Sequence, residues 1–533
     1  MAAAGTTGRS ARFRRALIAG ILFVSAFGAA WPQASGLKGP AGPAVLPEPS
    51  PRHLPRWRGF NLPDMVSADR LHGPFREEDF RLIARLGFNF VRLPLDYRLW
   101  IVGGDWEKID AAGFADVDRA VEWGIRYNLH VCLNLHRAPG YCVNPPAEPR
   151  NLFTDARAQR VCALHWAFIA RRYRDIPDRN LSFNLLNEPG TDDGPAYARV
   201  VAMLCEAIRR EDPDRLVIAD GLSWGTIPCR ELVPLRVAQA TRGYQPLALT
   251  HYRADWVDGA DAWPVPSWPP LPVGSFLYGP MQGVLAEPIT IEGPFGSDVR
   301  LRIRVEQVSN LCRMRVQADG KTVLDRTFRP GPGRGEWKKA VYSTKWKIWQ
   351  NFYDLDVIAR IPAGTRVLKI ENADGDWMTF TEIAFLPAGA KEETLLVPGD
   401  REWGSRQRPL RADLEDPLQP FTPLDAEAGA DREASAGATL LWERTIRPFA
   451  ELEREGVGVM VGEFGAYRFA PHAVVLSWMR DCLENWKRAG WGWALWNFRG
   501  DFGVLDSNRA DVVYERWEGH LLDRQMLELL QRF

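Results

Sequence analysis

Residues 77–95 read EEDFRLIARLGFNFVRLPL and contain two different apolar patterns, joined at a glycine. In residues 77–87 the apolar side chains recur at helical spacing, as expected for a helix buried along one side. Residues 88–95 form a short, mostly apolar run, which is typical of a strand buried on both faces. A helix followed directly by such a strand is the repeating unit of a parallel sheet covered by helices.

The same alternation continues on both sides of this unit. Further strands are expected at residues 58–62, 130–136, 181–188, 215–221, 246–252, 456–465 and 492–498, and further helices at residues 116–128, 198–212 and 473–490. Together with residues 88–95, these runs make about eight strands, the number that closes a barrel of roughly 250 residues. We therefore expect an α/β fold, a (β/α)8 TIM barrel.

The alternation breaks between residues 275 and 399, where short strand patterns are separated by turn sequences such as PGPGRG and ADGD. These strands are expected at residues 299–308, 312–319, 352–361, 366–372 and 380–386. Many short strands divided by Gly/Pro-rich turns predict an antiparallel β-sandwich. We expect it as an inserted domain between barrel strands 6 and 7, so that the barrel comprises residues 56–274 and 400–533.

The inserted domain has two interpretations. It could bind carbohydrate, with tryptophan rings stacking on sugars, because a flat apolar indole face fits the C–H face of a pyranose. It could instead be a lid or an oligomerisation surface, with the same rings in its core. The candidate stacking residues are Trp337, Trp346, Trp349 and Trp377.

The N-terminus has the layout of a secretory signal peptide. Arg9, Arg12, Arg14 and Arg15 precede an uninterrupted run of small and apolar residues, and alanine-rich candidate cleavage sites follow. We expect residues 1–34 to be the signal peptide and the Pro/Gly-rich residues 35–55 to be a linker, which predicts a secreted or periplasmic protein. A retained membrane anchor is the alternative, but the run is shorter than the roughly 20 residues that span a bilayer.

Composition excludes several classes of protein. Of the 533 residues, 67 are Lys or Arg and 67 are Asp or Glu, so no global basic field recruits nucleic acid. The 46% hydrophobic and 25% charged residues are typical of a globular chain. The seven cysteines show no CxxC spacing; a bridge between Cys142 and Cys162 and buried free thiols are both open. The 22 tryptophans make a saccharide-handling enzyme plausible.

Polar residues follow the predicted barrel strands at the points where each strand ends. In a TIM barrel those ends form one face, where catalytic groups lie. Two of the residues are glutamates, which suits glycosidic hydrolysis, because that reaction needs one carboxyl as acid and a second one to meet the oxocarbenium-like centre. The candidates are Arg92, His136, Asn187, Glu188, His251, Tyr252, Glu463 and Trp496.

The segments that carry these residues are RLP, NLH, LNEP, a His-Tyr pair, GEFG and WNFRGDFGVLDS. In this order and at strand ends they resemble glycoside hydrolase family 5, the cellulase-like retaining TIM-barrel glycosidases. The resemblance covers nearly all of residues 57–270 and 440–533. It implies that Glu188 is the acid/base and Glu463 the nucleophile, and that no metal or other cofactor is needed.

The resemblance also implies roles for the other candidates. Asn187 is expected to bind the sugar 2-OH, Arg92 to hold Glu463 in its ionised form, His136 to line the −1 subsite, and Trp496 to lie beneath that sugar. The family usually spaces a sixth-strand histidine and tyrosine as His-x-Tyr, whereas His251 and Tyr252 are adjacent. Either the strand register is locally shifted or one of the two residues is displaced.

The expected function is that of a secreted, retaining glycoside hydrolase that cleaves β-linked glucans as an endo-β-glucanase of cellulase type. Alternatives with the same machinery are action on β-1,3-glucan or β-mannan, or an exo-β-glucosidase; a non-catalytic carbohydrate-binding protein is a minor alternative. The expected partner is a β-linked polysaccharide or oligosaccharide, without nucleic acid and without a membrane span after signal cleavage. The oligomeric state stays open.

Overall fold

A computed structural model describes residues 45–69, 73–263, 265–269, 273–399, 401, 403–415, 420–424 and 436–533. The expected signal peptide, residues 1–34, and the first part of the expected linker lie outside these ranges. The last part of the linker packs on the barrel: Leu46 and Leu54 are buried, and the backbone N–H of Gly458 donates to the carbonyl of Pro51 at 2.8 Å. Within the described ranges, no helix combines the length and apolar character needed to cross a membrane.

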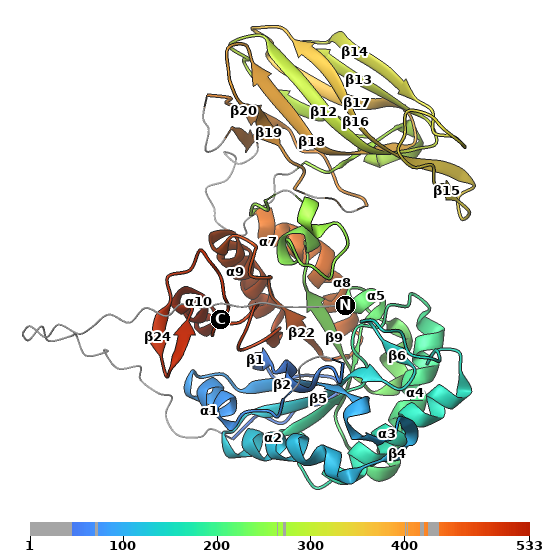
Figure 1. The fold of residues 1–533 in the computed structure, drawn as a ribbon, viewed down its shortest axis with the longest axis vertical. Helices are drawn as coiled ribbons and strands as arrows, with labels where there is room; N and C mark the ends of the chain where they lie inside the picture. Colours follow the sequence, from blue (N-terminus) through green and yellow to red (C-terminus); the bar gives the residue numbers. More distant parts are fainter. Residues whose placement is uncertain are drawn as a thin grey trace, which may run out of the picture. The chain divides into compact units, whose positions relative to one another are not determined.

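Eight parallel strands form a closed barrel (Figure 1). Neighbours along the sheet follow the order β2, β1, β23, β22, β9, β8, β7 and β5, and a pairing between β2 and β5 closes the ring. The strands are β1 (Arg58–Asn61), β2 (Phe90–Asp96), β5 (His130–Ala138), β7 (Leu181–Asn184), β8 (Val217–Asp220), β9 (Ala238–Gly243), β22 (Val459–Phe464) and β23 (Trp493–Leu495). The expected TIM barrel is confirmed.

Helices lie outside the strands because each has one apolar side (Figure 1). In α1 (Glu77–Arg85), Phe80, Leu82 and Ile83 are fully buried, and each such side chain contributes roughly 1.5–3 kcal/mol. The other long outer helices are α2 (Ala115–Arg126), α3 (Ala156–Tyr173), α4 (Gly194–Glu211), α9 (His472–Ala489) and α10 (Arg524–Arg532). Aspartates cap several of them; the Asp193 side chain, for example, accepts from the N–H of Ala196 at the start of α4.

The prediction of a strand at residues 246–252 is wrong. The sixth barrel strand is β9, and Leu247–Thr250 forms the short helix α6 just after it. The apolar run was misread because a run of this length fits a helix as well as a strand. The true strand carries buried polar side chains, Gln239, Thr241 and Arg242, and so lacks the apolar pattern that marks a barrel strand.

Two antiparallel sheets follow β9 in the chain and precede β22. The first comprises β10 (Phe276–Tyr278), β12 (Val299–Ser309), β15 (Tyr342–Ser343), β16 (Ile348–Ile361), β18 (Trp377–Pro387) and β19 (Thr394–Leu396). The second comprises β11 (Ile289–Glu292), β13 (Cys312–Ala318), β14 (Lys321–Phe328), β17 (Val367–Gly375), β20 (Leu410–Ala412) and β21 (Phe421–Pro423). Apolar residues of both sheets, such as Leu301 and Val316, share one core, and β20 and β21 extend the second sheet past residue 399.

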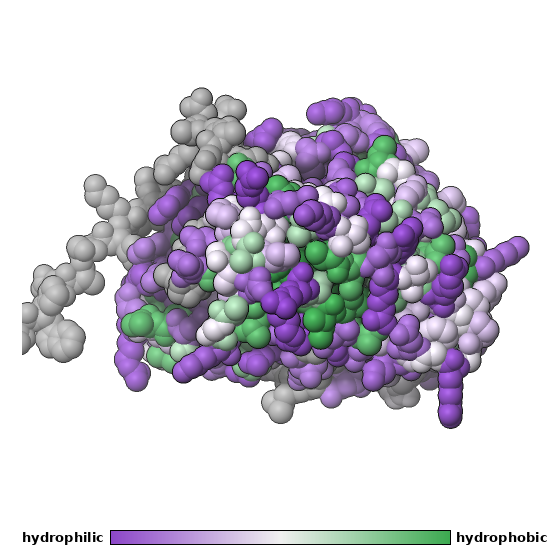
Figure 2. All heavy atoms as spheres, turned by 90° about the horizontal axis from the view of Figure 1, so that it is seen from above, coloured by the Kyte–Doolittle hydropathy of each residue, from purple (hydrophilic) through white to green (hydrophobic). Residues whose placement is uncertain are grey.

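Side chains along β12 alternate between the core and the solvent, which is why this sheet packs against a second one through one face. Val299, Leu301 and Ile303 point into the core, while Arg302 faces outward and pairs with Glu393 at 2.5 Å. Figure 2, which views the molecule from above, shows hydrophilic residues over much of the surface seen and a smaller group of hydrophobic residues near its middle. Of the four candidate stacking tryptophans, Trp346 is 64% exposed, whereas Trp337 packs against the sandwich core.

All seven cysteines lie in the described part of the chain and are free thiols. Cys142 and Cys162, the pair considered for a bridge, are not bonded to each other. Cys162 is fully buried on α3, so the interpretation as a buried free thiol describes it.

Candidate active site

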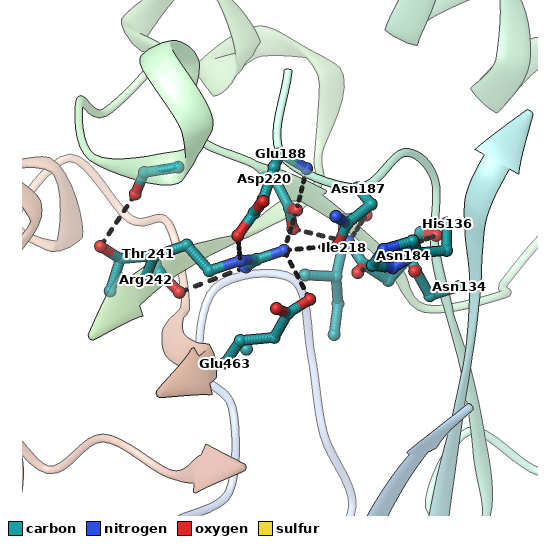
Figure 3. A network of polar contacts seen from close by, with 12 residues as sticks. Asn134, His136, Asn184, Asn187, Glu188, Ile218, Asp220, Thr241, Arg242 and Glu463 are labelled. Atoms are coloured by element: carbon teal, nitrogen blue, oxygen red, sulfur yellow. Dashed lines mark hydrogen bonds and ion pairs between the residues drawn. The ribbon is translucent and has the colours of Figure 1, made fainter. Parts of the chain in front are cut away.

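The carboxyl ends of seven barrel strands contribute residues to one face of the barrel, and Figure 3 shows six of them, which are, in chain order, His136, Asn187, Glu188, Asp220, Arg242 and Glu463. Parallel strands all end at the same mouth, so residues far apart in the chain meet there. The contributing residues are Arg92 in β2, His136 in β5, Asn187 and Glu188 after β7, Asp220 in β8, Arg242 in β9, Glu463 in β22 and Trp496 after β23.

Glu463 is buried and held by charged and polar donors. Arg92 Nη1 lies 2.6 Å from Glu463 Oε1, and the two side chains are 1% and 4% exposed. The hydroxyl of Tyr244 donates to Glu463 Oε2 at 3.2 Å. Burial and the charge of Glu463 raise the pKa of Tyr244 well above its ordinary value, so the phenol keeps its proton and remains a donor.

Glu188 follows Asn187 in a left-handed backbone conformation, with φ of 49°. Such a conformation costs of the order of 1–3 kcal/mol for a residue other than glycine, so the surroundings must hold it. The backbone N–H of Glu188 donates to Asp220 Oδ2 at 2.8 Å, and its carbonyl accepts from the Tyr141 hydroxyl at 2.5 Å. The backbone of Glu188 is therefore fixed from both sides.

The carboxyl of Glu188 has a raised pKa, as a proton donor requires. Burial raises its pKa to about 7, and the nearby charge of Glu463 acts in the same direction. Arg242 opposes this shift, because its Nε donates to Glu188 Oε1 at 3.0 Å. Arg242 Nη2 also lies 3.4 Å from Glu463 Oε1, so one guanidinium contacts both glutamates.

Asn187 presents a free donor to the same space. Its side-chain oxygen accepts from Arg92 Nη2 at 2.8 Å and from Arg242 Nη2 at 3.0 Å, which fixes the amide orientation. Its buried Nδ2 has no hydrogen-bond partner among the residues that the structure describes. A buried donor without a partner costs free energy unless a ligand supplies an acceptor, so Asn187 Nδ2 is suited to bind a substrate hydroxyl.

His136 and Trp496 lie together at the other side of the site. Their ring centroids are 5.6 Å apart, and His136 is 4% exposed. Burial, with the positive charges of Arg92 and Arg242, lowers the pKa of His136 well below its ordinary value, so the imidazole is neutral. Its Nδ1 is buried and without a partner in the described ranges, and can hydrogen-bond a ligand.

The structure separates the two sixth-strand candidates. Tyr252 is buried in the barrel core, with only 6% of its surface exposed. His251 stays nearer to the glutamates: its ring centroid lies 5.2 Å from that of Tyr244, and its Nδ1 lies 2.9 Å from Thr250 Oγ1. Since Tyr244 contacts Glu463, it takes the place at the site that the sequence analysis gave to Tyr252.

The sequence analysis missed three residues of the site: Asp220, Arg242 and Tyr244. A signal for two of them was present, because Arg242-Gly243-Tyr244 has the spacing of the His-x-Tyr pattern, with arginine in place of histidine. The misplaced strand hid it. Asp220 is the last residue but one of the predicted strand at residues 215–221 and ends the observed strand β8, so it could have been grouped with the other strand-end residues.

A cavity of about 930 Å³ lies beside Tyr141 and Gly190. Trp224 lines it and is 54% exposed, with the left-handed φ of 60°. The backbone N–H of Trp224 donates to the carbonyl of Pro189 at 2.9 Å, and its exposed indole offers an apolar face to a ligand in the cavity. Among the described residues, no group of three or more His, Cys, Asp or Glu side chains is placed to hold a metal ion.

Comparisons with known proteins agree with this geometry. Residues 53–246 match the family model described as cellulase, glycosyl hydrolase family 5. Endoglucanase C of Acetivibrio thermocellus is 30% identical over 192 residues, which are 35% of this chain and 55% of the relative. A sporulation-specific glucan 1,3-beta-glucosidase of Saccharomyces cerevisiae is 38% identical over 66 residues, 12% of this chain and 15% of the relative.

Solved structures extend the likeness beyond the first part of the barrel. A crystal structure of a glycoside hydrolase is 26% identical with a TM-score of 0.56, and the match covers 90% of this chain and 99% of that one. The match to the endoglucanase spans about half of that relative's length. The family model matches the part of the barrel that carries Arg92, His136 and Glu188.

Proposed function

Because residues 53–246 match the family model of glycosyl hydrolase family 5, we propose that the chain acts as a member of this family and hydrolyses β-linked glucans, as a retaining endo-β-glucanase. The observation that carries the proposal is the pair of glutamates at one guanidinium: Arg242 contacts Glu188 at 3.0 Å and Glu463 at 3.4 Å. The two carboxyls differ in their other contacts: Glu463 also meets Arg92 and the Tyr244 hydroxyl, whereas the pKa of Glu188 is raised, and such a difference suits a nucleophile and an acid.

The proposed mechanism is a double displacement. The Glu463 carboxylate attacks the anomeric carbon and forms an ester, while Glu188 gives its proton to the leaving sugar oxygen. Glu188 then takes a proton from water, and the water oxygen replaces Glu463 at the anomeric carbon. Retention of configuration results from the two inversions.

The remaining polar groups are assigned to the sugar in the −1 subsite. The free Nδ2 of Asn187 donates to the 2-OH, a contact that strengthens as the transition state forms. Neutral His136 binds a further hydroxyl, and Trp496 supports the apolar face of the ring. The pKa of Glu188, about 7, supports its role as the proton donor near neutral pH.

A second substrate is favoured by two observations. The short match to a glucan 1,3-beta-glucosidase and the ending WNFRGDFGVLDS both support exo-action on β-1,3-glucan as the alternative with the same residues.

We also propose that residues 1–34 direct export, on the basis of their arginines and apolar run.

The test is hydrolysis of a panel of soluble β-1,4-glucan, β-1,3-glucan and β-mannan, followed by NMR of the first-formed anomer. We expect fastest cleavage of β-1,4-glucan, release of internal fragments and a β-anomer as first product. Release of glucose only from chain ends of β-1,3-glucan would favour the alternative substrate, and an α-anomer as first product would contradict the double displacement.

A further inference from the structure

Asp220 and Arg242 form an ion pair at the centre of the site (Figure 3). Their side chains are 0% and 1% exposed. Asp220 Oδ1 accepts from Asn184 Nδ2 at 2.9 Å, and Oδ2 accepts from Arg242 Nη2 and from the backbone N–H of Glu188. Asp220 thus holds the backbone of Glu188, while Arg242 holds its carboxyl.

The charges around the site can be counted. Three carboxyl groups, those of Glu188, Asp220 and Glu463, surround two guanidinium groups, those of Arg92 and Arg242. Two permanent cations balance two carboxylates, so a third buried carboxylate would lack a counter-charge. The group is neutral when one carboxyl keeps its proton.

We propose that Asp220 and Arg242 are positioning residues that keep the net charge of these five side chains constant through both steps of the double displacement. Asp220 favours the protonated form of Glu188, and Arg242 pairs with the Glu188 carboxylate once the proton has left. The inference rests on the proposed function. Before reaction, Glu463 is the carboxylate and Glu188 carries the proton. After the first step, Glu463 is a neutral ester and Glu188 is the carboxylate.

The negative charge therefore moves from one partner of Arg242 to the other. Both positions lie against the same guanidinium, at Nε for Glu188 and Nη2 for Glu463. An arginine in place of a histidine suits this task, because it stays charged at every pH and its several donors can serve two acceptors at once. No charge has to be moved into or out of the buried site.

The electrostatics of Glu188 agree with this account. Burial and the charge of Glu463 raise its pKa, Arg242 lowers it and Asp220 raises it. Other titratable groups near the site are neutral: the phenols of Tyr141, Tyr244 and Tyr197, the last of which donates to the Asp220 carbonyl at 2.9 Å, and the imidazoles of His136 and His251. The charges of Asp220 and Arg242 therefore act on Glu188 in opposite directions, and neither belongs to a residue assigned to bind substrate or to react.

The test is the pH dependence of kcat/KM for three variants, Asp220→Asn, Arg242→Gln and the double variant. Asparagine still accepts from the Glu188 N–H but lacks the charge, so the alkaline limb moves to lower pH by about one to three pH units. Arg242→Gln moves it to higher pH. The double variant restores the charge balance, so we expect it to fold even if Arg242→Gln alone does not. Its alkaline limb returns to within about half a pH unit of the wild-type position.

A matched control exists at the other end of β8. Asp178 Oδ1 accepts from the backbone N–H of Leu216 at 3.1 Å and lies 3.1 Å from Arg215 Nη1, the same pairing as at Asp220. Asp178→Asn leaves the alkaline limb where the wild type has it, because Asp178 is remote from Glu188.

An unmoved limb in Asp220→Asn, or a double variant shifted as far as Asp220→Asn, would overturn the inference. The cycle is read on whichever β-glycoside the wild type cleaves. Failure to cleave β-glucan therefore refutes the proposed substrate, whereas the pattern of shifts tests the positioning residues alone.

Discussion

Arg92 and Glu463 form a buried ion pair, with 2.6 Å between Nη1 and Oε1. The pair joins the second barrel strand to the seventh, and the same guanidinium donates through Nη2 to Asn187. One arginine thereby fixes the proposed nucleophile and the proposed 2-OH ligand relative to each other. Orientation of this kind lowers the entropic part of the barrier, since the reacting groups are ordered before the substrate arrives.

Glu463→Gln should lower kcat/KM by at least about 10⁴-fold, because the neutral amide cannot form the glycosyl ester. The glutamine oxygen still accepts from Arg92, so the fold should persist. The measurement is hydrolysis of soluble β-1,4-glucan, with circular dichroism and thermal unfolding as control. Wild-type-like turnover in a folded variant would end the assignment of Glu463.

The alkaline limb of kcat/KM should lie near pH 7, because burial raises the pKa of Glu188 to about 7. Below that pH Glu188 carries the proton that the leaving oxygen needs, and above it activity falls about tenfold per pH unit. Glu188→Gln should remove the limb while retaining part of the activity on an aryl β-glycoside whose leaving group needs no proton. An unchanged limb in that variant would assign it to another group.

Asn187→Ala should reduce kcat/KM about ten- to a hundredfold, the range expected for a hydrogen bond that strengthens in the transition state. A 2-deoxy substrate should cost the wild type a similar factor but cost the variant much less, since the partner is already absent. Equal losses with the 2-deoxy substrate in both enzymes would mean that Asn187 Nδ2 binds elsewhere.

Tyr244→Phe should lower kcat/KM about tenfold, because it removes the donor at 3.2 Å from Glu463 Oε2. Tyr252→Phe is the matched control, since the same atom is removed from a ring buried in the barrel core. It should change kcat/KM less than twofold. The reverse order of effects would restore Tyr252 to the site and displace Tyr244.

The barrel could be predicted from the sequence wherever strands are apolar. Residues 90–95 and 130–136 are buried throughout, so their patterns predict β2 and β5 directly. β9 could not be found in the same way, because Gln239, Thr241 and Arg242 place polar side chains in the barrel. A strand that serves the site lacks the apolar pattern by which barrel strands are recognised.

The sequence predicted the site residues that follow strands whose ends are marked by an apolar run. Glu188 and Glu463 follow apolar runs, and the structure brings both to Arg242. Arg242, Asp220 and Tyr244 depended on three-dimensional neighbours: nothing in the chain links Asp220 to the backbone of Glu188, which is 32 positions away. The φ of 49° at Glu188 likewise follows from Asp220 and Tyr141, not from local preference.

The most direct measurement is to trap the covalent intermediate with an activated 2-deoxy-2-fluoro β-glucoside or β-cellobioside, since the fluorine destabilises the oxocarbenium-like transition states. Digestion and mass spectrometry then locate the sugar. The account predicts one glycosyl group per chain, attached to Glu463, and none in Glu463→Gln. A sugar on any other residue of the active wild-type enzyme would contradict it.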